Sequence, residues 1–118
     1  MASRQEKCKC GADVGSLLDN IRILEGNLRD VKIENSPTYI PAFEGSINSI
    51  YSNIRKVEDS CGIDAREEQD DCSIVSNKVN DMRFAKDQTK FDNIRGGILT
   101  DLSKIRYGTM EKVKRCST

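Results

Sequence analysis

The sequence contains no histidine and no tryptophan, and its aromatic residues are limited to three tyrosines and three phenylalanines. Without histidine, the commonest general base is missing, and neither a Ser–His nor a Cys–His pair can form. The chain also lacks the Ser-x-x-Lys, Gly-x-Ser-x-Gly, Gly-x-Gly-x-x-Gly and Walker-type Gly-Lys-Ser/Thr sequences of common catalytic and nucleotide-binding sites. We therefore expect a protein that is not an enzyme.

The sequence also lacks a net charge, because 19 lysines and arginines balance 19 aspartates and glutamates. A neutral chain has no overall field that would draw it to nucleic acid or to an acidic membrane surface. No apolar run is long enough to cross a bilayer, and residues 1–7 lack the apolar centre of a signal peptide. We therefore expect a cytoplasmic protein without a membrane span, with leaderless secretion as the alternative.

Two segments of the chain carry apolar residues at alternating steps of three and four. This spacing is typical of the a and d positions of helices that pack as in a coiled coil. In the first segment these positions are Val14, Leu17, Ile21, Leu24, Leu28 and Val31. In the second they are Ile40, Phe43, Ile47, Ile50, Ile54, Val57 and Cys61.

Pro37 and Pro41 separate the two segments. A proline ends a helix that precedes it, and it is tolerated in a first helical turn because the N–H groups there have no helical partner. We therefore predict one helix over about 13–34 and a second over about 41–60. Two helices with one apolar stripe each and a short connection pack antiparallel.

The second half of the chain has a less regular pattern. One stripe runs through Cys72, Val75, Val79 and Met82, and a second set, in a different phase, follows with Phe84, Phe91, Ile98 and Ile105. A stripe that changes phase indicates a helix that bends, unwinds or changes partner. Gly96-Gly97 lies inside the second set, and two adjacent glycines cost about 2 kcal/mol in a helix interior. The pair is either a hinge or a turn, and we favour a turn between helices at about 64–95 and 98–115.

These patterns predict an all-α fold. Residues 1–118 form a single domain, an antiparallel bundle of three or four helices with coiled-coil-like heptad packing, and residues 1–12 form an N-terminal segment that carries cysteines. The widened apolar stripe of the first helix, which includes Leu18 and Ile23, either completes the core or binds a partner helix.

Four of the five cysteines are predicted to meet at one end of the bundle. In an up-down-up-down arrangement, the start of the first helix lies beside the end of the second and the end of the fourth. Four thiolates at one end could hold a structural zinc ion, and the same cysteines could instead form disulfides or remain free thiols. The candidate ligands are Cys8, Cys10, Cys61 and Cys116, whereas Cys72 lies on an apolar stripe and is expected to be buried.

The function that best fits this sequence is non-catalytic. We expect a helical protein that binds another protein or assembles with itself as a homo-oligomer, and Tyr39 and Ile40, at the tip of the first turn, are the candidate partner contacts. One alternative is a zinc-stapled helical module whose basic C-terminal end contacts nucleic acid. The other is a leaderless secreted helical protein with disulfides.

Overall fold

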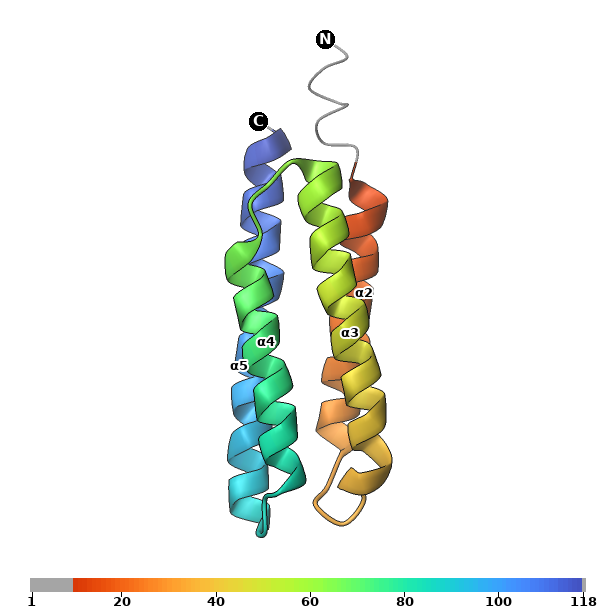
Figure 1. Cartoon of the computed structure of the whole chain (residues 1–118), viewed down its shortest axis with the longest axis vertical. Helices are drawn as coiled ribbons and strands as arrows, with labels where there is room; N and C mark the ends of the chain where they lie inside the picture. Colours follow the sequence, from red (N-terminus) through yellow and green to blue (C-terminus); the bar gives the residue numbers. More distant parts are fainter. Residues whose placement is uncertain (1–9, 118) are drawn as a thin grey trace.

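The computed structural model describes residues 10–117 of the chain and the side chains of residues 10–114. It contains the helices α2 (Gly11–Asp30), α3 (Ser36–Cys61), α4 (Arg66–Arg83) and α5 (Gln88–Ser117), and no strand occurs among these residues. The helices run alternately down and up along one long axis, with overall extents of 57 × 19 × 17 Å (Figure 1). The predicted all-α antiparallel bundle is confirmed, with four helices in the described part of the chain.

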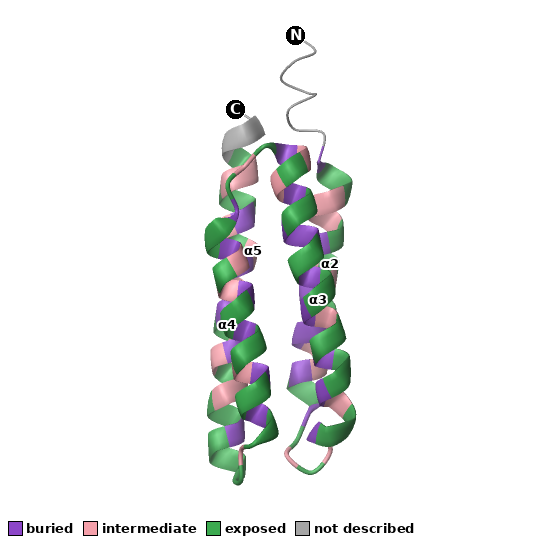
Figure 2. Ribbon diagram, viewed as in Figure 1, coloured by how far each residue is buried: buried purple, intermediate pink, exposed green. Residues whose placement is uncertain are grey.

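The heptad stripes form the core. Every predicted stripe position of α3 is buried, as are those of α4, and in α2 only Val14 remains partly exposed. Buried positions line the inner face of each helix while the outer faces are exposed (Figure 2). The periodicity therefore identifies the core correctly, because a helix in such a bundle can bury only one stripe.

The turn between α2 and α3 differs from the prediction, because α2 ends at Asp30 and α3 already begins at Ser36. Asn35 accepts the Lys32 N–H at 2.6 Å, which closes this short connection. Pro37 occupies the first turn of α3, and Pro41 lies inside the helix. The predicted start near Pro41 is therefore wrong, because a proline this close to the N-terminus removes only one helical hydrogen bond.

The connection between α4 and α5 also corrects the prediction. α4 ends at Arg83, and Asp87 precedes α5 and accepts the Lys90 N–H at 2.8 Å, as an N-cap does. Gly96 and Gly97 lie within α5, so the expected turn at these glycines is wrong, and so are the bounds 64–95 and 98–115. The change of phase after Met82 marks the true turn.

Phe84 does not share a buried stripe with the other members of its predicted set. Its side chain lies in this turn and is 70% exposed. The rest of its set, Phe91, Ile98 and Ile105, is fully buried on α5 together with Leu102. The four helices form a ring in which α2 packs beside both α3 and α5. Of the four neighbouring helix pairs, α2 and α5 are the pair whose backbones come close to each other at the fewest positions.

Candidate functional site: the disulfide end and the α2–α5 groove

A disulfide joins Cys10, which directly precedes α2, to Cys61, the last residue of α3. The two Cα atoms lie 5.3 Å apart, and both side chains are buried. The antiparallel topology thus brings these two cysteines together, as the sequence predicts. Cys8 and the side chain of Cys116 lie outside the described residues, so their place at this end of the bundle stays a prediction.

The disulfide bears directly on the predicted zinc site. Zinc binds cysteine as the thiolate, and a sulfur atom in a disulfide is not a thiolate. Among the described residues, no group of three or more Cys, Asp or Glu side chains is placed to hold a metal ion. A zinc site made of Cys8, Cys10, Cys61 and Cys116 and the Cys10–Cys61 disulfide therefore exclude each other.

Cys72 is the free cysteine of the described residues and lies on the inner face of α4. Its side chain is 2% exposed, and its sulfur lies 3.7 Å from the Ile47 carbonyl oxygen. Burial raises the pKa of the Cys72 thiol to about 11. The thiol therefore stays protonated at neutral pH and serves as an apolar core residue, as predicted.

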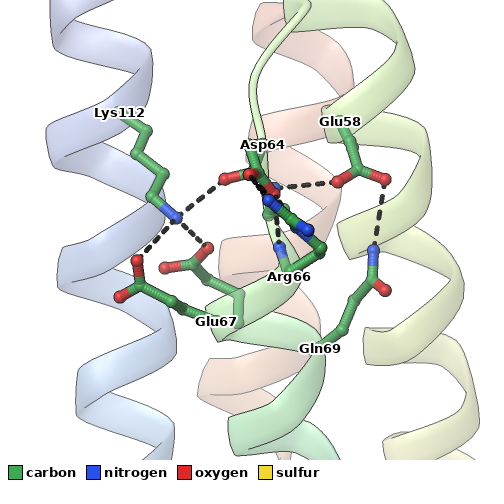
Figure 3. Close-up of polar contacts among 8 residues, drawn as sticks. Glu58, Asp64, Arg66, Glu67, Gln69 and Lys112 are labelled. Atoms are coloured by element: carbon green, nitrogen blue, oxygen red, sulfur yellow. Dashed lines mark hydrogen bonds and ion pairs between the residues drawn. The ribbon is translucent and has the colours of Figure 1, made fainter.

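A polar network closes the α3–α4 connection at the disulfide end (Figure 3). Glu58 accepts the Ala65 N–H at 2.8 Å and the Gln69 side-chain amide at 3.2 Å. Lys112, from α5, donates to the Asp64 carbonyl oxygen at 2.8 Å. The hydrogen bond from Arg66 holds the pKa of the exposed Asp64 carboxyl at about 2. The loop after Cys61 is thus fixed to three helices, α3, α4 and α5.

Three ion pairs that include a buried carboxylate join α5 to its neighbours. Glu68 of α4, which is 2% exposed, pairs with Lys112 at 2.7 Å. Asp101 of α5, which is 4% exposed, pairs with Lys78 of α4 at 2.6 Å. The third pair joins Glu25 of α2 to Arg106 of α5. Buried charges are costly unless they are paired, so these pairs fix how α5 sits against α2 and α4.

An apolar groove lies between the first half of α2 and the last turns of α5. It has a volume of about 590 Å³, and Glu111 and Lys114 line it together with five apolar or aromatic residues, Val14, Leu18, Tyr107, Met110 and Val113. Tyr107 is 66% exposed and Met110 is 46% exposed. The groove thus combines a hollow with two exposed side chains, between the two neighbouring helices whose backbones come close at the fewest positions.

The structure changes the view of the two predicted partner contacts. Ile40 is 3% exposed and belongs to the core, so its side chain is not available to a partner in this structure. Tyr39 is partly buried and its ring lies 5.9 Å from that of Phe43, measured between centroids. A contact through Ile40 is therefore not supported, because the helix begins before this residue and turns it inward. The contact through Tyr39 stays a prediction.

Only some of the residues that line the groove could be identified from the sequence. Leu18 stood out because it lies beside the main stripe of the first helix, and it does line the groove. Tyr107 and Met110 gave no such signal, because their exposure depends on how α5 is rotated against α2. The Glu25–Arg106 pair contributes to fixing that rotation, and its two residues are 81 positions apart in the chain.

None of the helices in the described part of the chain has a stretch apolar enough to span a membrane. Comparisons of the chain with protein families, with curated proteins and with solved structures find no match. The function therefore has to be argued from the residues themselves.

Proposed function

We propose that this chain is a non-catalytic helical protein that works by binding another protein or a second copy of itself through the α2–α5 groove. The observation that carries this proposal is the groove itself, with Tyr107 and Met110 exposed beside Val14 and Leu18. Exposed apolar groups gathered around a hollow are typical of protein interaction sites, and a groove between two helices suits a partner helix.

The charges at this end of the bundle favour a protein partner over nucleic acid. Two basic residues of the C-terminal end, Arg106 and Lys112, are paired with Glu25 and Glu68. A cation that is neutralised within the fold contributes little to phosphate binding. In the lining of the groove, the positive charge of Lys114 is balanced by the negative charge of Glu111, so the groove carries no net positive charge.

Site-specific photocrosslinking tests the proposal. A photoreactive phenylalanine analogue replaces Tyr107 in one variant and Phe84 in a matched control, since Phe84 is also aromatic and 70% exposed but lies at the opposite end of the bundle. We expect a discrete covalent protein adduct from position 107 in cells that produce the protein, and none from position 84. Failure of position 107 to give any adduct contradicts the proposal.

The disulfide favours a second candidate, a helical protein that works in an oxidising compartment. Disulfides persist in such compartments and are rare where glutathione keeps thiols reduced. The test is to alkylate the protein at the moment of cell lysis and to measure its mass before and after reduction. Cys10 and Cys61 that escape the first alkylation and react after reduction support this candidate, whereas direct alkylation of both residues contradicts it.

A further inference from the structure

We infer that the occupant of the α2–α5 groove is a second copy of this chain, related to the first by a two-fold axis. This inference rests on the proposed function and specifies its partner. In a two-fold dimer the same patch is used by both copies, so the patch must be complementary to itself. The groove meets this requirement in shape and in charge.

The shape of the patch is self-complementary, because it carries both a hollow and the groups to fill one. Val14 and Leu18 line the α2 side of the groove, and Tyr107 and Met110 stand out on the α5 side. A two-fold axis perpendicular to α5 lays the grooves of the two copies over each other in antiparallel fashion, so Tyr107 and Met110 of each copy are covered by the other copy. Each copy then covers the apolar side chains that it would otherwise expose to water.

The charges around the groove are self-complementary as well. Glu111 and Lys114 both line it, and they lie three residues apart on α5. When two α5 helices meet in antiparallel fashion about a two-fold axis between these positions, Glu111 of each copy faces Lys114 of the other. The chain has no net charge, so two copies do not repel each other at long range.

Other occupants fit the groove less well. Residues 1–9 are Met-Ala-Ser-Arg-Gln-Glu-Lys-Cys-Lys, whose single large aliphatic side chain, that of Met1, cannot fill an apolar groove. The stretch Tyr107–Lys114 is about 12 Å of helix, at about 1.5 Å per residue. A patch of this length forms the centre of a small interface, so we expect a weak dimer that dissociates on dilution.

Sedimentation analysis over a range of protein concentrations tests the inference, with the free thiols alkylated so that no intermolecular disulfide contributes. The wild-type mass is expected to rise from 13.2 kDa towards twice that value as the concentration increases. Y107S should weaken association at least about tenfold, since it removes a central aromatic group. The matched control F84S should associate like the wild type, and circular dichroism checks that both variants are folded.

A charge exchange gives the sharpest evidence for the two-fold arrangement. E111K and K114E should each weaken self-association, because each places like charges opposite each other across the axis. An equimolar mixture of the two variants should form a heterodimer, because one supplies two lysines and the other two glutamates. A mixture that associates no better than either variant alone overturns the proposed axis.

The two proposals can fail separately. A wild-type protein that stays monomeric at every concentration, while position 107 still crosslinks to a different protein, overturns the dimer and supports the broader function. An adduct from position 107 with the mass of two copies supports both. Absence of any adduct together with a monomeric mass overturns both.

Discussion

The two hairpins of the bundle are each made of two antiparallel helices, but they are stabilised differently. The α2–α3 hairpin is joined by an unbroken apolar seam and by the Cys10–Cys61 disulfide. In the α4–α5 hairpin the apolar seam is accompanied by ion pairs that include the buried carboxylates of Glu68 and Asp101. Apolar burial is non-directional, whereas an ion pair requires one particular geometry. The second hairpin therefore depends more strongly on the exact position of its helices.

The largest expected effect concerns the apolar core that both hairpins share. Phe43 in α3 and Phe91 in α5 are fully buried, so F43A and F91A should each lower the free energy of unfolding by about 3–5 kcal/mol. F84A should change it by less than about 0.5 kcal/mol, because Phe84 is 70% exposed. Urea unfolding followed by circular dichroism measures all three. Equal losses from F84A and F91A would mean that the assigned α4–α5 turn is wrong.

The disulfide should account for the next largest effect, and it acts on the first hairpin alone. It closes a loop of 51 residues, and the loss of such a constraint costs about 2–4 kcal/mol. The variant with both C10S and C61S should lose this amount relative to the oxidised wild type. A reductant should destabilise the wild type and leave the double variant unchanged. Equal stability of the wild type with and without reductant would contradict a structural role for this bond.

Gly108 tests the polar packing of the second hairpin. A methyl group added here would clash with the Oε2 atom of the buried Glu68, whose Oε1 atom pairs with Lys112. G108A should therefore lower the free energy of unfolding by about 1–3 kcal/mol, as overpacking in a core does. In the E68A background the same change should cost clearly less, because the clashing carboxylate is gone. Additive effects in this double-mutant cycle would show that the two residues do not touch.

The contrast between the hairpins also explains how much of the fold could be predicted. The seam from Val14 to Cys61 follows a regular period, and a period is a local property that the sequence displays directly. The topology then placed Cys10 beside Cys61, so the chemistry of the disulfide end was partly predictable. The choice among a disulfide, a zinc site and free thiols was left open, because all three use the same residues.

Two kinds of feature could not be predicted in this way. The cost of two adjacent glycines favours a turn at Gly96-Gly97, whereas the true turn ends at Asp87, whose N-cap role a local pattern can indicate but does not establish. The Glu25–Arg106 pair and the groove around Tyr107 depend on residues far apart in the chain. A local pattern contains no information about which outer position of α5 will face α2.

Gly96 should give the smallest effect, and of opposite sign. It lies in the interior of α5, and apart from the adjacent residues and the backbone of the same helix, no heavy atom lies within 4 Å of the position that a Cβ atom would occupy. G96A should therefore raise the free energy of unfolding by about 0.5–1 kcal/mol, since alanine loses less conformational entropy in a helix than glycine does. G97A should gain less, because its Cβ atom would lie 3.3 Å from the Lys78 Nζ atom that pairs with Asp101. If these glycines instead formed a turn with a positive φ angle, G96A would lower the free energy of unfolding. The sign of this small change therefore decides between a continuous α5 and two shorter helices.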